Sequence, residues 1–268
     1  MTELFLPRDV RAVFLDVGGV LFIPDPAGVR AALAEAGLTC TDRDVDRAVY
    51  ADGPADLGMG SEDSADTVDW HVRAFAARLA RAMGTPPRAL EPAMAGIRRA
   101  LTRAEWAVRE EWATREGLRA LAKAGVPVVV VTNAEGQAEG NLRHHGLCHV
   151  GPGPGLEVRA VVDSGAPGVG VSKPDPEIFR IALSHVDAAP AEVLHLGDSV
   201  RNDVACSAAV GITGVHFDPY AVCTDRSAHP HVTSLTQLAV EVGGRQRASL
   251  SPDAPRPARV ALQATPSR

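Results

Sequence analysis

Two aspartates that each follow an apolar run are the residues of this sequence best suited to chemistry. Asp16 comes directly after Val13-Phe14-Leu15, and Asp198 follows Val193–Leu196 by one glycine, with Asp203 five positions later. If these runs are buried parallel strands, the carboxylates meet in the crevice at the carboxyl ends of the strands, where open α/β sheets bind ligands. Carboxylate oxygens are ligands that Mg²⁺ prefers, and a carboxylate can also attack a phosphoryl group.

A lysine and a Thr-Asn pair extend this set. Only two of the 27 basic residues are lysines, and one of them, Lys173, follows a glycine-rich stretch. An ammonium group can neutralise the negative charge that builds up as a carboxylate approaches a phosphoryl group. Thr132 and Asn133 follow the apolar run Val128–Val131, where a hydroxyl and backbone N–H groups can grip phosphoryl oxygens.

The elements that must position these groups alternate between strand and helix patterns. Apolar runs predict buried parallel strands at Arg11–Leu15, Val126–Val131, Val193–Leu196, Ile212–Phe217 and, more weakly, Val158–Val162. Helical patterns lie between them, at Thr114–Ala124, Glu135–His145, Pro176–Ser184 and Asp203–Val210. This alternation predicts an α/β fold with a Rossmann-like, doubly wound parallel sheet.

The stretch after the first predicted strand breaks this rhythm. From about Pro24 to Ala113 no convincing strand occurs, and the apolar residues Val68, Val72, Phe75, Leu79 and Met83 recur at helical spacing. We therefore expect residues 1–22 and 114–242 to form the core and residues 23–113 to form an inserted α-helical cap. Residues 243–268, rich in Pro, Ser and Arg, are expected to be a disordered tail. The interior of the cap is the expected place of Trp70, Trp106 and Trp112.

Composition and charge narrow the function classes. The chain has 268 residues, of which 46% are hydrophobic, and no run approaches the roughly 18–20 apolar residues of a membrane span. Its mixed, acidic first residues predict no signal peptide. The net charge of −6 argues against nucleic-acid binding. We expect a cytoplasmic protein with neither a membrane nor a nucleic-acid partner.

The cysteines and histidines show no spacing typical of a metal site. Four widely spaced cysteines are expected to be reduced and packed: Cys40, Cys148, Cys206 and Cys223. The pairs His144-His145 and His229-Pro230-His231 have no acidic or cysteine partner at a useful spacing, so we expect them at helix ends and in loops. His195 lies inside a predicted strand, where we expect a hydrogen-bonded core residue.

Four segments together resemble the motifs of the haloacid dehalogenase-like (HAD) superfamily. Phe14 to Leu21 resembles the first motif, Thr132-Asn133 the second, Lys173 within Gly170 to Phe179 the third, and Gly197 to Asp203 the fourth. They occur in the family's order, each at a strand end or helix start, across about residues 10–218. The resemblance implies a subfamily I hydrolase with a helical C1 cap.

The resemblance also implies roles for the matching residues. Asp16 would be the nucleophile of a Mg²⁺-dependent phosphatase, forming an aspartyl-phosphate, with Lys173 as its charge partner and Thr132 and Asn133 binding the phosphoryl group. Mg²⁺ would be held by Asp16, the Gly18 carbonyl and Asp198, with Asp203 acting directly or through water. Asp198 and Asp203, five apart after an apolar run, also suit this metal by their chemistry alone.

The sequence departs from the family at Gly18. Family phosphatases usually carry a second aspartate here, which protonates the leaving alcohol and then activates water. A glycine keeps the backbone carbonyl but loses this acid–base group, a loss worth about 10²–10⁴-fold in rate. Three other residues are weighed as its replacement: His71, Glu105 and Glu111.

Three functions therefore stay open. The first is a phosphatase for a small phosphorylated metabolite, acting as a monomer or homodimer. The second is a catalytically weak or inactive relative that binds a phosphometabolite or a partner, as Gly18 suggests. The third is a 2-haloacid dehalogenase, which the intact acidic cluster disfavours because such enzymes need no metal.

Overall fold

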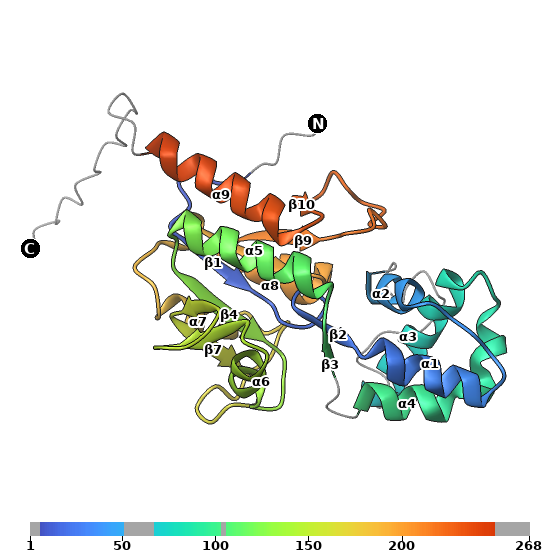
Figure 1. Cartoon of the computed structure of the whole chain (residues 1–268). Coiled ribbons are helices and arrows are strands. Elements are labelled where there is room, and N and C mark those ends of the chain that lie inside the picture. The colour runs from blue at the N-terminus through green and yellow to red at the C-terminus, as the bar shows by residue number, and fades with distance from the viewer. Residues whose placement is uncertain (1–5, 51–66, 103–105, 250–268) are drawn as a thin grey trace, which may run out of the picture.

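The computed structural model describes residues 6–50, 67–102 and 106–249 (Figure 1). A six-stranded sheet lies at its centre, in the order β10-β9-β8-β1-β4-β7, and all neighbouring strands in it are parallel. Its strands are β1 (Ala12–Leu15), β4 (Val128–Thr132), β7 (Ala160–Asp163), β8 (Val193–Gly197), β9 (Thr213–Phe217) and β10 (His231–Val232). The predicted α/β fold class is confirmed.

Helices cover both faces of this sheet because the side chains of its strands alternate. Val13 and Leu15 of β1 join one hydrophobic core with α5 (Glu111–Ala124) and α9 (Leu235–Ser249), which lie side by side (Figure 1). Ala12 and Phe14 point the other way, into a second core with α7 (Glu177–Leu183) and α8 (Cys206–Ala208). The sheet is therefore doubly wound, as the apolar runs predict.

Two predicted elements differ from the structure. The single strand predicted at Val158–Val162 is split, because the Arg159 N–H bonds to the Val128 carbonyl and turns the chain onto β4. The part before it, β6 (Leu156–Val158), pairs instead with β5 (Cys148–Val150) in a small separate sheet.

The helix predicted from Asp203 begins earlier, as the π-helix η5 (Val200–Ala205), because the Ser199 hydroxyl accepts the Asn202 N–H and caps it. The other predicted helices are found with shifted ends. Gly125, at φ 74°, ends α5 as expected, and α6 (Ala138–His144) follows β4.

A helical insert separates β1 from α5. It contains α1 (Pro26–Glu35), α2 (Asp42–Tyr50), α3 (Thr67–Ala82), the 3₁₀ helix η3 (Pro87–Ala93) and α4 (Met94–Thr102). These helices share a hydrophobic core of their own, separate from the two cores of the sheet. Figure 1 shows this helical insert to one side of the sheet, beyond β2 and β3.

The expectation that the insert has no strand is wrong. β2 (Phe22–Pro24) and β3 (Trp106–Val108) form an antiparallel ribbon where the chain enters and leaves the insert. Each has only three residues, too few for a period-2 pattern, and its partner is far away in the sequence.

The carboxyl-terminal boundary also differs from the prediction. α9 continues past Gly243 to Ser249, because Leu238 and Val242 hold it in the core against α5. The remaining part of the predicted tail, residues 250–268, lies outside the described residues. Among the described helices, none is long and apolar enough to cross a membrane.

Candidate active site

Asp16 and Asp198 meet because β1 and β8 are adjacent parallel strands in register. Leu15 pairs with Leu196, and the Asp16 N–H donates to the Leu196 carbonyl at 2.9 Å. Both carboxylates therefore leave the same edge of the sheet. Asp16, Asp198 and Asp203 each offer an oxygen, and these oxygens lie within 4.8 Å of one another.

Lys173 is buried between two of these carboxylates. Its Nζ lies 2.9 Å from Asp16 Oδ1 and 2.7 Å from Asp203 Oδ1, and it donates to the Val131 carbonyl at 3.3 Å. Burial alone would lower the pKa of Lys173, but the charges of Asp16 and Asp203 outweigh it and hold that pKa above its ordinary value. Lys173 therefore stays protonated beside Asp16.

Asp203 is held on both oxygens. Oδ1 accepts from Lys173 and lies 2.9 Å from His195 Nε2, while Oδ2 accepts the Ser199 N–H at 2.9 Å. Burial opposes ionisation, yet Lys173 and His195 lower the pKa of Asp203 below its ordinary value. Gly197 permits this approach, because a Cβ there would lie 2.0 Å from Asp203 Cγ. Asp203 therefore positions Lys173, and His195 is the hydrogen-bonded core residue expected from the sequence.

Asp198 has a different environment. Burial and the neighbouring charges of Asp203 and Asp16 raise the pKa of Asp198 well above its ordinary value. Its carboxylate packs against Gly19, where a Cβ would lie 2.3 Å from Asp198 Oδ2 and φ is 68°. The three carboxylates offer only oxygen ligands, and Lys173 balances part of their charge, so the cluster fits a divalent cation such as Mg²⁺.

The two carboxylate oxygens of Asp16 differ in their hydrogen-bond partners. Oδ1 accepts the Val17 N–H at 2.7 Å and also lies beside Lys173, whereas no hydrogen bond to Oδ2 is found among the described residues. Burial raises the pKa of Asp16, and Lys173 counteracts this. Oδ2 is thus the oxygen left available for a cation or for a reacting atom.

Thr132 and Asn133 reach the same place from the end of β4. Asn133 and the Lys173 backbone exchange two hydrogen bonds: Asn133 Nδ2 donates to the Lys173 carbonyl at 2.7 Å, and the Lys173 N–H donates to Asn133 Oδ1 at 2.8 Å. The Asn133 amide is therefore engaged in holding Lys173. Both Thr132 and Asn133 also line the cleft beside the acidic cluster.

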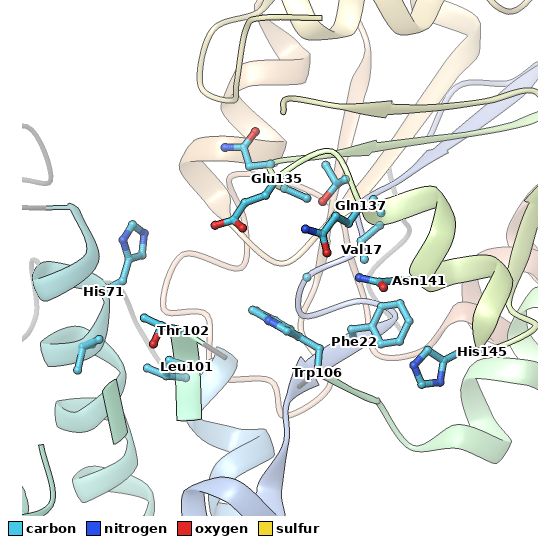
Figure 2. Close-up of a pocket in the computed structure, with 16 residues that line it drawn as sticks. Val17, Phe22, His71, Leu101, Thr102, Trp106, Glu135, Gln137, Asn141 and His145 are labelled. Atoms are coloured by element: carbon cyan, nitrogen blue, oxygen red, sulfur yellow. The ribbon is translucent and has the colours of Figure 1, made fainter. Parts of the chain in front are cut away.

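That cleft lies between the sheet edge and the helical insert, with a volume of about 430 Å³ (Figure 2). Gly18 lines it, and a Cβ at this position would meet no atom of the described residues within 4 Å. Figure 2 shows Glu135 and Gln137 on the sheet side and His71 on the insert, with Trp106 between them. A small molecule can therefore contact Gly18, the sheet and the insert together.

The expected tryptophan interior is wrong for the two tryptophans whose side chains are described. Trp106 is 41% exposed and lines the cleft, and Trp112 is 77% exposed at the start of α5. Both stand near the junction of insert and core, outside the insert's hydrophobic core. The side chain of Trp70 lies outside the described residues.

Of the residues weighed as substitutes for a second aspartate, one lies at the cleft and another lies on the surface. His71 lines the cleft, whereas Glu111 is exposed and pairs with Arg115 at 2.9 Å. Glu105 lies outside the described residues.

Two insert residues that the sequence did not single out reach the site. Arg78 of α3 interacts electrostatically with Asp198, and its buried Nε has no hydrogen-bond partner among the residues that the structure describes. Tyr50 of α2 donates its hydroxyl to the Gly19 carbonyl. Arg78 lies between the apolar residues Phe75 and Leu79 of α3. A charged residue so close to the buried face of a helix is a sequence signal that could have marked it as a site residue.

Comparisons with known proteins agree with this geometry. A family model described as haloacid dehalogenase-like hydrolase matches residues 10–211. A phosphoserine phosphatase of Thermus thermophilus is 33% identical over 162 residues, which span 59% of this chain and 58% of the relative. The mouse haloacid dehalogenase-like hydrolase domain-containing protein 3 is 36% identical over 105 residues, 38% of each chain. The chain thus matches less than two thirds of the length of these curated relatives.

A solved structure supports the fold. The HAD hydrolase YfnB of Bacillus subtilis, determined bound to magnesium, has a TM-score of 0.50 and 15% identity over 87% of this chain and 99% of that one. The family match spans most of the chain and includes every residue of the acidic cluster. The chain belongs to the haloacid dehalogenase-like hydrolases.

Proposed function

We propose that this hydrolase is a Mg²⁺-dependent phosphatase for a small phosphorylated metabolite, with Asp16 as the nucleophile. One observation carries the proposal: the carboxylates of Asp16, Asp198 and Asp203 converge within 4.8 Å, with the Lys173 ammonium 2.9 Å from Asp16. The phosphoserine phosphatase among the relatives supports the same reaction class. The helical insert would be the C1-type cap of subfamily I, closing over the cleft.

The reaction would proceed in two steps at Asp16. A carboxylate oxygen of Asp16 forms a bond to phosphorus while the bond from phosphorus to the substrate oxygen breaks, and the departing alkoxide takes up a proton. Water then attacks phosphorus and gives a proton back to the group that protonated the alkoxide, the bond from phosphorus to Asp16 breaks, and inorganic phosphate leaves with Asp16 restored. Lys173 offsets negative charge near Asp16 in both steps.

Asp16, Asp198 and the Gly18 carbonyl would hold Mg²⁺, with Asp203 orienting Lys173 and acting on the metal directly or through water. When bound, the cation would neutralise charge on the phosphoryl oxygens and help to orient them. The Asp16 and Asp198 oxygens have the chemistry that this cation prefers.

Proton transfer needs another donor, because Gly18 has no side chain. The cleft that Gly18 lines also contains His71 and Glu135. We propose that one of these groups, or water held by them, protonates the leaving alkoxide.

Arg78 extends the site into the insert. Its positive charge interacts with the charge of Asp198, and within the described part of the chain its buried Nε has no hydrogen-bond partner. A buried guanidinium group is suited to a phosphoryl or carboxylate oxygen of the substrate. We propose that Arg78 binds such an anionic group, which joins substrate binding to closure of the insert.

The test is phosphate release from a panel of phosphorylated metabolites with Mg²⁺, using Asp16→Asn as the control. The proposal predicts that the natural protein releases phosphate, that Asp16→Asn does not, and that a chelator of Mg²⁺ abolishes the release by the natural protein. Release that is equal in Asp16→Asn, or absent from the whole panel, would contradict it.

A second candidate rests on Gly18. A relative without the acid–base aspartate could bind a phosphometabolite or a partner without turning it over. It predicts that phosphate compounds raise the melting temperature in the presence of Mg²⁺ while no phosphate is released, which separates it from the first candidate.

A further inference from the structure

Three histidines and a cysteine form a cluster at β9 and β10, the two strands at one edge of the sheet. The His/Cys cluster consists of His216, Cys223, His229 and His231, and each residue offers one ligand atom within 4.8 Å of the others. His216 on β9 and His231 on β10 are register partners in adjacent parallel strands. Their side chains therefore leave the sheet next to each other on the same face.

The loop that joins β9 to β10 supplies the other two members. Asp218, fully buried at its start, accepts the backbone N–H groups of Val222 and Cys223 at 2.8 and 3.2 Å and pairs with Arg226 at 2.6 Å. These bonds fold the loop back over the two strands. Cys223 and His229 thereby meet the strand histidines, although the sequence separates them.

Two distances between the ligand atoms are close to the edge lengths of a zinc tetrahedron, and all four atoms lie within 4.8 Å of one another. Cys223 Sγ lies 3.7 Å from His229 Nε2, which lies 3.2 Å from His216 Nδ1. Bonds of about 2.0–2.1 Å to nitrogen and about 2.3 Å to sulfur around one Zn²⁺ give edges of about 3.3–3.6 Å. Small side-chain movements would complete such a shell.

Two further observations favour a metal ion at this cluster. Nε2 of His231 is buried and has no hydrogen-bond partner in the described ranges of the chain, a state that costs free energy and that a bound metal would relieve. Nε2 of His216 lies 3.1 Å from the Asp198 carbonyl, which only accepts, so this nitrogen carries the proton. Nδ1 of His216 then presents a lone pair to the cluster, and metal-bound histidines commonly show this pairing with a carbonyl.

We propose that His216, Cys223, His229 and His231 form a structural site for Zn²⁺ that fastens the β9–β10 loop. Four protein ligands leave no open position, as in structural zinc sites rather than catalytic ones. The sulfur and nitrogen ligands select a transition metal over Mg²⁺, so this site is chemically distinct from the acidic cluster. Through the His216 bond, the metal would also steady the Asp198 backbone.

The first test is a titration of the chelator-treated full chain with Co²⁺ in excess Mg²⁺, which occupies oxygen-ligand sites. The proposal predicts one Co²⁺ per chain, with thiolate-to-cobalt absorption and the bands of a tetrahedral ion, both lost when Zn²⁺ is added. Absence of the thiolate-to-cobalt absorption from the natural protein would overturn the site.

Matched variants test the ligand set. Cys223→Ser and His229→Gln are expected to weaken Co²⁺ binding at least about 100-fold, more than loss of an outer contact. The controls Cys40→Ser and His185→Gln should bind as the natural protein does. Circular dichroism verifies folding, and His229→Gln gives the test without touching the thiol. A variant of Cys223 or His229 that binds Co²⁺ unchanged would overturn the assignment.

Hydrogen exchange gives a readout independent of spectroscopy. Removing Zn²⁺ is expected to speed backbone exchange in residues 218–231 while exchange in α6 and α7 stays unchanged. Equal exchange with and without Zn²⁺ in that loop would contradict a fastening role.

Discussion

Position 18 shows how one residue can change the chemistry of an otherwise complete site. Asp16 lies 2.9 Å from Lys173 and offers an oxygen within 4.8 Å of one of Asp198, whereas Gly18 carries no side chain beside them. The backbone there has no positive φ, and a Cβ would meet nothing within 4 Å in the part of the chain that the structure describes, so this part accepts a side chain without strain. The missing acid–base group is therefore a property of this residue alone.

We predict that Gly18→Asp raises kcat by about 10²-fold for alkyl phosphates, because the new carboxyl group can protonate the leaving oxygen. The kcat for an aryl phosphate, whose leaving group needs no proton, should rise much less. Gly18→Asn, which has the same shape but transfers no proton, is the control. An equal gain from Asp and Asn would show that general acid catalysis is not the cause.

Arg78 is expected to act on substrate binding. Arg78→Met keeps much of the apolar stem but removes the charge, so KM should rise at least about tenfold, as expected for loss of a charge-assisted hydrogen bond of about 1.5–3 kcal/mol. Steady-state kinetics on the preferred substrate measure this, with Arg73→Met, on the exposed side of the same helix, as the control. Unchanged KM in Arg78→Met would remove Arg78 from the site.

At the scale of elements, close packing of α5 on α9 supports the sheet that carries the site. Gly117 of α5 faces Leu235 of α9, and a Cβ at Gly117 would lie 2.2 Å from Leu235 Cβ. Gly140 of α6 is also helical, yet a Cβ there meets no described residue within 4 Å. The same substitution should therefore have opposite effects at the two positions.

Gly117→Ala is predicted to lower the free energy of unfolding by about 1–3 kcal/mol, the usual cost of overpacking. Gly140→Ala should raise it by about 0.4–1 kcal/mol, because alanine reduces the freedom of the unfolded chain. Urea denaturation of both variants measures the difference. Equal effects at the two glycines would contradict the packing described for α5 and α9.

The sequence predicted the elements that have a strong local pattern. β1, β4, β8 and β9 are apolar runs buried on both faces, and each was found close to its predicted place. β3 and β10 have three and two residues, too few to show a period, and only a distant partner makes them strands. The same reason explains the His/Cys cluster, because strand register brings His216 to His231.

The candidate site was predictable to the same degree. Asp198, Asp16 and Asn133 follow β8, β1 and β4, which are adjacent in the sheet, so their convergence follows from topology. What the sequence did not indicate is how the side chains are used: Asn133 holds Lys173, and Asp203 is held on both oxygens. Such partners depend on distances that no sequence spacing specifies.

At the scale of the whole molecule, insert and core are joined around the acidic cluster. Arg109, after β3, lies 3.2 Å from Asp46 of α2, and Tyr220 of the β9–β10 loop donates its hydroxyl to the same carboxylate. Tyr50 of α2 bonds to Gly19 beside Asp198. Binding at the cluster should therefore stabilise the entire chain against unfolding.

We predict that Mg²⁺ at about 100 times its Kd raises the free energy of unfolding by about 2.7 kcal/mol. Asp198→Asn should lose this gain and, without Mg²⁺, be at least as stable as the natural protein, since it removes a buried charge beside two others. Thermal unfolding measures both effects, with the exposed Asp187→Asn as the control. A full Mg²⁺ effect in Asp198→Asn would place the cation elsewhere.

The central claim is that Asp16 carries the phosphoryl group beside a cation held with Asp198. A crystal structure with Mg²⁺ and beryllium fluoride, which mimics a phosphoryl group on a carboxylate, tests it most directly. We predict that beryllium bonds to an Asp16 oxygen, that Mg²⁺ is bound by Asp16, Asp198 and the Gly18 carbonyl, and that Lys173 lies near the fluorine atoms. An adduct away from Asp16, or Mg²⁺ with no contact to Asp198, would contradict the account.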